Sequence, residues 1–256
     1  MEPSGTSPRM PPESSPSLFP VTRWTLLQRV RAGSDEDARA ALNTLCSAYW
    51  YPLYCVARQK GLGEHDAQDA VQGFFECMLR RETFTVADES VGKLRGLLLS
   101  SFTHYCGQQW QRANRQKRGG GSEHLPLDGF VDAEAAEQRY LRTGAGEASL
   151  EVLYNREWAA AVLERSLLAL RNDYVQRGWQ ERYELLVGPL LQEQEDASLV
   201  QIAARAGATA TALRTTLHRM RRHYRDKIER ELATTPDTDD PSEIRQEMVE
   251  LCKAFS

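Results

Sequence analysis

The chain has 256 residues, a formal net charge of −4 and 41% hydrophobic residues. This length can bury one sizeable hydrophobic core or two small ones, and the hydrophobic content is ordinary for a globular protein. No apolar run approaches the length needed to cross a bilayer, which argues against a membrane-spanning protein and against a membrane as partner.

Cysteine and histidine usage argues against disulfides and metal sites. The five cysteines are scattered without a CxxC pair, and an odd number at such spacings is typical of free, mostly buried thiols in a reducing cytoplasm. No histidine lies at ligand spacing from a cysteine, so we expect no metal site. The sequence also lacks a glycine-rich phosphate loop and paired acids near a histidine. We therefore expect a cytoplasmic protein that is not an enzyme, with no catalytic residue and no cofactor.

Positive charge is concentrated in two segments of this acidic chain. Residues 90–119 hold six lysines and arginines and no acid. Residues 201–230 hold seven arginines and one lysine against two acids. Two basic patches on an acidic body suggest two contacts with one polyanion, while the acidic remainder disfavours indiscriminate binding.

The helical period dominates the whole chain, so we predict an all-α fold. A leader rich in proline and serine, residues 1–18, is predicted to be disordered. We place a first small helical domain at 19–118, a flexible linker rich in glycine and acid at 119–149, and a second helical domain at 150–232. Residues 233–256 are predicted to hold one amphipathic helix.

The first domain is predicted to begin with an aromatic-rich helical segment and a shorter amphipathic helix. The first is either a helix pair or one helix interrupted near Pro52, and it ends at Gly61. The second has an apolar stripe made of Ala67, Ala70, Val71, Phe74 and Met78. Another face of this second helix carries the polar residues Asp66, Asp69, Gln72 and Glu76. Gly73 interrupts it at a cost of about 1 kcal/mol relative to a good helix former.

A helix-turn-helix pattern follows in the second domain. Leu199, Ile202 and Ala203 give a short helix with an apolar face, and Gly207 stands where a left-handed residue would end it. Thr209 can then cap the next helix. Two helices joined by a turn of about three residues that contains glycine form this motif.

The second helix of the motif has an apolar and a basic stripe. The apolar stripe is predicted to pack on the domain and consists of Leu213, Leu217, Met220 and Tyr224. The basic stripe lies about 100° away and consists of Arg214, His218, Arg221 and Arg225.

The basic stripe has the arrangement with which such motifs contact DNA. The N-terminal part of the second helix meets base edges, and cations further along grip phosphates. The candidate base-facing residues are Thr211, Arg214, Thr215 and His218. The candidate phosphate contacts are Arg219, Arg221, Arg222 and Arg225. The alternative is a solvated basic face on an ordinary helix.

Three stretches, in this order, resemble RNA polymerase sigma factors of the extracytoplasmic-function (ECF) type. DAQDAVQGFF resembles the core of sigma region 2.2, and KLRGLLLSSFTHYCGQQWQRANRQKR is similar to regions 2.3 and 2.4. LVQIAARAGATATALRTTLHRMRRHYR resembles region 4.2. FPVTRWTLL, with YWYPLY and QKRGGG, resembles a subgroup with an extended N-terminus that is common in planctomycete-like bacteria. The resemblance implies a sigma region 2 domain and a sigma region 4 domain.

The resemblance also implies partners and sites. The partners are core RNA polymerase and promoter DNA, with an anti-sigma or other regulatory protein as a further partner that the resemblance allows. The polymerase-binding face would consist of Asp66, Asp69, Gln72 and Glu76. The promoter backbone beside the −10 element would be followed by Arg112, Arg115, Lys117 and Arg118. The helix-turn-helix would read the −35 element in the major groove.

Aromatic residues of the first domain have two alternative roles. Aromatic faces with nearby cations hold the unstacked bases of an opened duplex well, and Trp110 is the candidate for this contact. Phe102 and Tyr105 could equally lie in the core. Phe74 and Phe75 are predicted to be core residues.

The last stretch, DDPSEIRQEMVELCKAFS, predicts a capped amphipathic helix. Asp240 is its candidate N-cap, and Pro241 stands at the first helical position. One face carries Ile244, Met248, Leu251 and Phe255. Such a stripe needs cover, either from the chain's own second domain or from a regulatory contact that is autoinhibitory or made with another protein.

A stand-alone helix-turn-helix transcriptional regulator is the alternative function. It would leave the basic, aromatic segment 102–118 unexplained. A scaffold of helices that binds no DNA would leave both basic patches unexplained. A stand-alone regulator should bind a palindromic site without polymerase, whereas a sigma factor should need polymerase and an asymmetric, two-part site.

Overall fold

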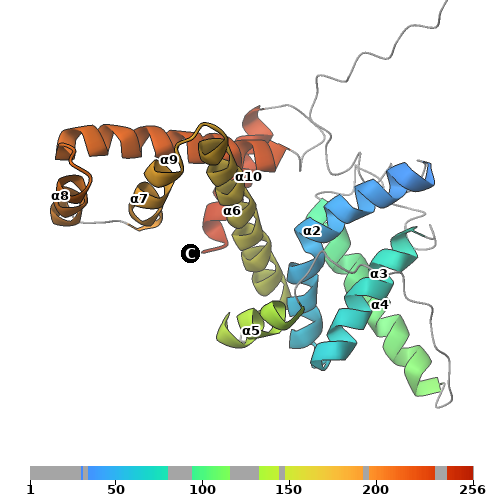
Figure 1. Cartoon of the computed structure of the whole chain (residues 1–256). Helices are drawn as coiled ribbons and strands as arrows, with labels where there is room; N and C mark the ends of the chain where they lie inside the picture. Colours follow the sequence, from blue (N-terminus) through green and yellow to red (C-terminus); the bar gives the residue numbers. More distant parts are fainter. Residues whose placement is uncertain are drawn as a thin grey trace, which may run out of the picture.

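The computed structural model describes Val30 and residues 34–79, 94–115, 133–143, 148–192, 196–233 and 241–255. These residues form helices and no strand, so the predicted all-α class is confirmed for this part of the chain (Figure 1). The helices are α2 (Asp35–Gln59), α3 (Glu64–Leu79), α4 (Leu94–Arg115), α5 (Ala133–Thr143), α6 (Leu150–Gln176), α7 (Gln180–Leu191), α8 (Asp196–Arg205), α9 (Ala210–Ala233) and α10 (Pro241–Lys253). None of the helices described here is long and apolar enough to span a membrane. The predicted leader, 1–18, lies outside the described residues.

Helix α2 is one continuous helix rather than a pair. The Ser34 hydroxyl oxygen caps its start by accepting a hydrogen bond from the Asp37 amide at 3.2 Å. The helix then continues through the buried Pro52 to Gln59. Gly61 follows with a φ of +89°, a left-handed conformation that glycine adopts without steric cost. The predicted end of this segment at Gly61 is confirmed.

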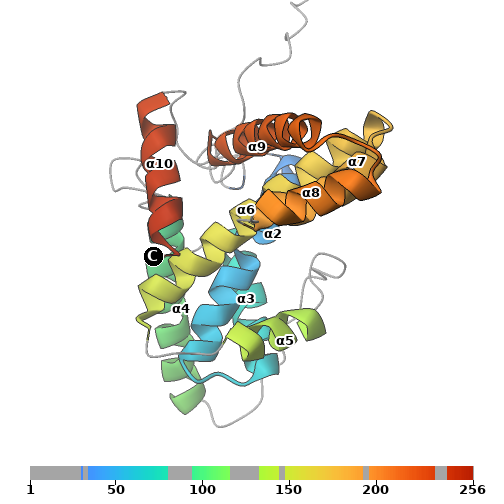
Figure 2. The same cartoon turned by 90° about the vertical axis from the view of Figure 1, so that its left-hand side faces the viewer.

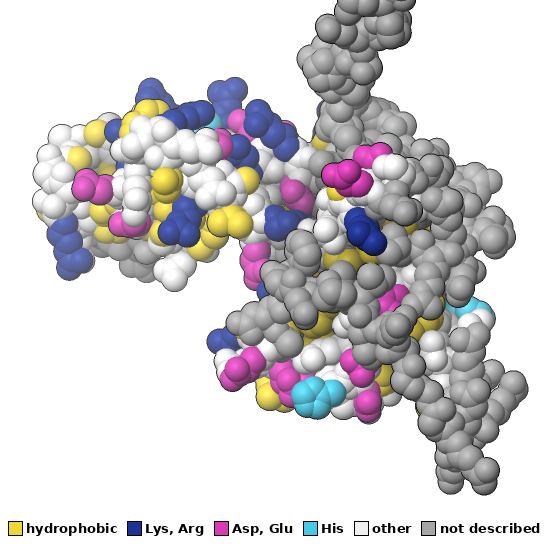
Figure 3. All heavy atoms as spheres, turned by 45° about the vertical axis from the view of Figure 1, so that its right-hand side comes forward, with side chains coloured by type: hydrophobic (Ala, Val, Ile, Leu, Met, Phe, Trp, Pro, Cys, Tyr) yellow, Lys and Arg dark blue, Asp and Glu magenta, His cyan; other side chains and the backbone are white. Residues whose placement is uncertain are grey.

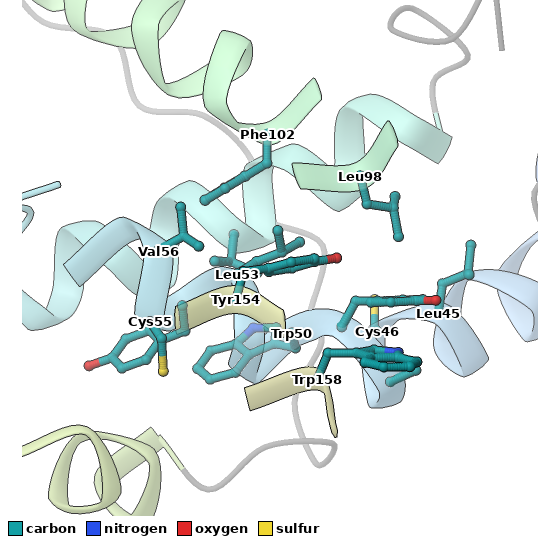
Figure 4. Packing of buried hydrophobic residues seen from close by; sticks show 14 of the residues in the cluster. Leu45, Cys46, Trp50, Leu53, Cys55, Val56, Leu98, Phe102, Tyr154 and Trp158 are labelled. Atoms are coloured by element: carbon teal, nitrogen blue, oxygen red, sulfur yellow. The ribbon is translucent and has the colours of Figure 1, made fainter. Parts of the chain in front are cut away.

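A first apolar core lies between α2, α3, α4 and the N-terminal half of α6 (Figure 4). Its largest fully buried side chains include Tyr49, Tyr54, Phe74, Phe75, Phe102, Tyr154 and Trp158. The Phe102 ring meets the Phe74 ring edge-on, with 5.3 Å between the centroids. Phe74 and Phe75 are therefore confirmed as core residues, and Phe102, which the sequence left open, is one as well.

A second, smaller core lies between the C-terminal half of α6 and helices α7, α8 and α9. Its buried residues are Leu170, Tyr174, Tyr183, Leu186, Leu199, Ala203, Leu213, Leu217 and Met220. Tyr224 is half-buried, and its hydroxyl donates a hydrogen bond to the Leu163 carbonyl at 3.1 Å. Burial raises the pKa of Tyr224 to about 12. The predicted apolar stripe of α9 therefore packs as expected.

Helix α6 belongs to both cores (Figures 1 and 2). Trp158 and Val162 are buried in the first core, whereas Leu170 and Tyr174 are buried in the second. The C-terminal end of α9 also reaches the first core, through Ile228. The predicted boundary at residue 150 therefore does not separate two cores, because the two halves of one 27-residue helix are covered by different partners.

Part of the predicted flexible linker, 119–149, is a helix docked on the first core. In α5, Ala136 and Tyr140 are buried at positions i and i+4. The Glu137 carboxylate accepts hydrogen bonds from the Tyr54 hydroxyl and, at 2.8 Å, from Arg58. These contacts order residues 133–143, although their composition is polar and poor in bulky apolar side chains.

The cysteines are thiols rather than disulfides. Cys46 and Cys55 are buried, Cys77 and Cys106 are half-buried, and Cys252 is exposed. Burial raises the pKa of Cys46 and of Cys55 to about 12, so these two thiols stay protonated at neutral pH. The prediction of mostly buried thiols is confirmed for two of the five.

Helices α3 and α4 approach each other closely at Gly73. A Cβ atom added at Gly73 would stand 2.5 Å from the Tyr105 hydroxyl oxygen and 3.6 Å from its Cζ. The Tyr105 ring is half-buried and packs on Phe74, with 5.8 Å between the centroids. This contact explains a glycine in the middle of a helix, because no other residue leaves room for the hydroxyl group.

We expect Gly73→Ala to lower the free energy of unfolding by about 1 kcal/mol. Overpacking lowers the free energy of unfolding by about 1–3 kcal/mol. The better helix propensity of alanine raises it by about 1 kcal/mol. Gly73→Ala/Tyr105→Phe should be more stable than Gly73→Ala alone, because it leaves an ordinary contact at 3.6 Å. Urea unfolding followed by circular dichroism measures the free energy of unfolding of both variants. If Gly73→Ala alone stabilised the protein, the contact between Gly73 and the Tyr105 hydroxyl would not be tight.

Candidate nucleic-acid interface

Helices α8 and α9 form a helix-turn-helix with the predicted turn. Gly207 has a φ of +61°, and the next amide, that of Ala208, donates a hydrogen bond back to the Ala203 carbonyl at 3.0 Å. The Thr209 hydroxyl oxygen then accepts a hydrogen bond from the Ala212 amide at 3.2 Å and caps α9. The left-handed glycine and the threonine cap are both confirmed.

The predicted base-facing and phosphate-contacting side chains lie together on the exposed side of α9. The exposed residues are Thr211, Arg214, Thr215, His218, Arg219, Arg221, Arg222 and Arg225. Lysine and arginine side chains follow the upper edge of the lobe that contains α7 to α9 (Figure 3). The buried stripe on the other side of α9 holds the helix in place, so this basic face points away from the core.

Two of these side chains are oriented by backbone groups. The Thr215 hydroxyl donates a hydrogen bond to the Thr211 carbonyl at 3.0 Å and keeps an acceptor lone pair for a ligand. Arg221 donates a long hydrogen bond, 3.4 Å, to the Pro189 carbonyl near the end of α7. Arg221 is therefore held beside α7 at one border of the basic face.

Helix α9 itself contributes no acid to this face between Arg214 and Arg225. Between Arg214 and Arg225 the chain has five arginines, two histidines and no acid. The nearby Asp173 of α6 instead pairs with Lys227, with 2.5 Å between the carboxylate oxygen and Nζ. This hydrogen bond lowers the pKa of Asp173, so the carboxylate stays ionised and neutralises Lys227 rather than the basic face.

The C-terminal part of α4 presents one large exposed aromatic side chain. Trp110 is 70% exposed, which is unusual for tryptophan. Arg112 and Arg115 lie in the last turns of α4, but their side chains are not among those described. Lys117 and Arg118 lie outside the described residues. Trp110, Arg112 and Arg115 thus belong to the C-terminal part of a helix whose N-terminal part, with Leu94 and Leu98, is in the first core.

Arg95 does not belong to this basic segment. It is one of the six cations of residues 90–119, but it is only 7% exposed. Its guanidinium group is paired with Glu247 and Glu250 of α10. Arg95 therefore does not contribute to an exposed basic surface on α4.

The polar face of α3 is divided. Asp66 and Asp69 are exposed, whereas Gln72 is half-buried and donates a hydrogen bond to the Glu76 carboxylate at 3.3 Å. Glu76 is only 6% exposed, so the prediction that it lies on an exposed docking face is wrong. Glu76 lies seven residues after the exposed Asp69 and only about 20° from it around the helix, so its burial comes from the packing of α4 on this part of α3.

Comparison with known proteins adds no relative. No family model, no curated protein and no solved structure matches this chain. The chemistry of the interface therefore has to be inferred from its own geometry.

The exposed cations of α9 are arranged to suit a long polyanion. The exposed cations are spread along one side of a helix rather than gathered around a cavity. Within the described ranges, no three histidine, cysteine or acidic side chains are placed to hold a metal ion. A row of arginines with neighbouring hydroxyl groups can bind a phosphate backbone and base edges at the same time.

One buried charged cluster could not be found from the sequence. It joins Arg95 of α4 to Trp158 of α6 and to Glu247 and Glu250 of α10. The spacing of the two acids at i and i+3 on α10 is the only local signal. Their partner lies 152 residues away from Glu247 along the chain, too far for a periodic pattern to reveal.

Proposed function

We propose that the chain is a promoter-specific sigma factor of the ECF type. It binds core RNA polymerase through the exposed acids of α3. It contacts the −10 region of promoter DNA through the end of α4 and the −35 element through α9. The observation that carries the proposal is the exposed basic face on the capped second helix of a helix-turn-helix.

Helix α9 supplies the sequence-reading contact. Arg214 and His218 lie on its exposed side in the first turns, where a recognition helix meets base edges in the major groove. Arginine can donate two parallel hydrogen bonds to a guanine, which makes it the commonest specific reader. Arg222 and Arg225 follow further along the same helix and suit phosphate contacts.

Helix α4 supplies a different kind of contact, one suited to single-stranded DNA. An exposed indole can stack on an unpaired base, which contributes about 1–3 kcal/mol per base. Trp110 has this exposure and stands next to Arg112 and Arg115 in the chain. A regulator that binds only closed duplex has no use for such a contact, so Trp110 favours the sigma factor over the stand-alone regulator.

The acids of α3 supply the polymerase contact. Asp66 and Asp69 are exposed three residues apart, on one side of the helix. Two neighbouring carboxylates suit a basic partner surface and repel DNA. The face is smaller than the sequence predicted, because Glu76 is buried and Gln72 lies at its edge.

Charge reversal on α3 tests the polymerase contact. We expect Asp66→Arg/Asp69→Arg to bind core RNA polymerase at least about tenfold more weakly, because like charges across an interface repel. The matched control is Glu181→Arg/Glu184→Arg, an exposed pair at the same spacing at the start of α7. Co-purification with core polymerase measures the affinity, and thermal unfolding confirms that both variants fold.

The same experiment separates the two functions. Wild-type chain and control should both bind polymerase under this proposal. Absence of polymerase binding by the wild-type chain, together with tight binding to a palindromic duplex, would contradict the proposal and establish a stand-alone regulator.

A further inference from the structure

A polar cleft lies between the end of α6 and the C-terminal half of α9. Its volume is about 210 Å³. Pockets that enclose a whole small molecule measure about 300–1,000 Å³, so this cleft has room for one compact group rather than for an entire cofactor. The residues that line it do not include the candidate base and phosphate contacts of α9. The cleft is therefore a feature separate from the basic face.

The floor of the cleft is apolar and well packed. Leu170 and Tyr174 of α6 form it, and both are buried in the second core. Three rings meet the Tyr174 ring edge-on, with centroid distances of 5.9 Å for Trp179, 6.1 Å for Tyr183 and 6.4 Å for His223. His223 also lines the cleft. A site whose walls are already ordered loses little conformational entropy when a ligand binds.

Three permanent cations converge on this cleft. Lys227 and Arg230 come from α9, and Arg177 follows the last turn of α6. All three act on one carboxylate, that of Asp173. The hydrogen bond from Lys227 has the largest effect and lowers the pKa of Asp173, and the charges of Arg177 and Arg230 lower it further. The two guanidinium groups and the ammonium group therefore lie around a common centre.

The cleft keeps an excess of positive charge. Asp173 is paired with Lys227, with 2.5 Å between the carboxylate oxygen and Nζ. The second acid of the cleft, Asp226, lies with the guanidinium groups of Arg177 and Arg230. One carboxylate cannot neutralise two guanidinium groups. A concave site with such an excess attracts anions.

The Arg177 side chain is oriented by an aromatic ring. Its guanidinium carbon lies 5.5 Å from the centre of the Trp179 ring. Trp179 is in turn held against the buried Tyr174. An arginine that stacks on an aromatic ring keeps the N–H groups at its edge for hydrogen bonds to an anion. Arg177 is thus positioned for a ligand by the ring beneath it.

The charged cluster under α10 differs from the cleft, because the chain itself closes it. Arg95 and Glu247 are paired there, with side chains only 8% and 5% exposed. Leu251 is buried in the first core, and Met248 packs against it, so the predicted apolar stripe of α10 is covered by the chain. Phe255 departs from that prediction, because it lies beyond the helix and is 52% exposed.

We propose that the cleft between α6 and α9 binds a phosphate group. Arg177 donates hydrogen bonds to it from the α6 side and Arg230 from the α9 side. The oxygens of a phosphate can accept from both at once, whereas a carboxylate is matched by a single guanidinium group. Two sources offer such a group, a free phosphorylated compound and the backbone of DNA. The inference goes beyond the proposed sigma function and does not rest on it.

The test titrates the full chain with inorganic phosphate at constant pH and ionic strength, with chloride as the replaced anion. The ring signals of His223 in nuclear magnetic resonance spectra report binding inside the cleft. The cleft variant Arg177→Gln/Arg230→Gln is compared with the control Arg39→Gln/Arg171→Gln, which removes two exposed arginines of α2 and α6 that do not line the cleft. Thermal unfolding confirms that both variants fold. If the cleft variant does not fold, Arg230→Gln alone replaces it.

We expect the His223 signals of the wild-type chain and of the control to move to a saturable end point. The cleft variant should bind phosphate at least about tenfold more weakly, because charge-assisted hydrogen bonds are lost. Equal affinity of the cleft variant and the wild-type chain would overturn the site, since the response would then be general screening.

A second titration, with a short DNA duplex, distinguishes the two sources. If the duplex moves the His223 signals and the cleft variant weakens this effect, the bound group is a backbone phosphate. If only inorganic phosphate does so, the ligand is a free phosphorylated compound. The absence of a saturable change with either probe would overturn the site. That result would leave the sigma function standing, because polymerase binding and transcription test it separately.

Discussion

Replacement of Arg214 and His218 with alanine is expected to lower polymerase-dependent transcription about a hundredfold. Both side chains are exposed in the first turns of α9, on the side away from the buried Leu213 and Leu217. Each good base contact contributes about 1–3 kcal/mol of discrimination, and about 2.8 kcal/mol in total corresponds to a factor of a hundred. The free energy of unfolding should not fall, because neither side chain is in the core and alanine favours the helix.

The control for this variant is an exposed arginine elsewhere in the fold. Arg39 lies on α2, outside both basic segments, and Arg39→Ala should leave transcription unchanged. Run-off transcription and binding of the polymerase complex to promoter duplex are the two measurements. Arg222→Ala provides a contrast, because loss of a phosphate contact should weaken binding to all sequences alike and reduce its salt dependence. Full activity of Arg214→Ala/His218→Ala would show that this face does not read the promoter.

Trp158→Ala is expected to lower the free energy of unfolding by about 3–5 kcal/mol, a large part of the total stability of a domain. The Trp158 side chain of α6 is only 1% exposed in the first core, and the Arg95 guanidinium group packs on the face of its ring. Its removal leaves a cavity in the first core and takes away the surface on which a buried cation rests. Guanidinium chloride unfolding measures the loss.

Two further variants show whether this loss of stability depends on the buried position of Trp158 and on the volume of side chain removed. Trp158→Phe should cost less, because it fills part of the space and the indole N–H has no hydrogen-bond partner among the described residues. Leu168→Ala lies on the exposed side of the same helix, where Leu168 is 54% exposed, and should change stability by less than about 0.5 kcal/mol. A loss below about 1 kcal/mol for Trp158→Ala would contradict the packing described for α2 and α6.

The local features of the fold could be predicted because their signals are local. Gly207 and Thr209 stand three residues or fewer from the ends of the helices that they terminate and cap, and the structure has both in those roles. The apolar stripe of α9 repeats within one helix, so its period alone identifies the buried side. Phe74 and Phe75 of α3 were likewise predicted to be core residues, and both are fully buried.

The remaining features depend on contacts between distant segments. Residues 133–143 look like a linker, and only their docking on the first core, through Ala136, Glu137 and Tyr140, makes them part of the fold. Arg95 looks like one more cation of a basic segment until α10 pairs with it. Glu76 belongs to the polar face of α3 by its period, and only the packing of α4 on that part of α3 buries it. Composition and period carry no information about such partners.

Run-off transcription with purified core RNA polymerase, on fragments of the genome that encodes the chain, tests the central proposal most directly. The proposal predicts specific transcripts that require both the chain and polymerase and that start downstream of asymmetric, two-part sites. Tight binding to a palindromic duplex without polymerase, and no specific transcript with it, would contradict the proposal.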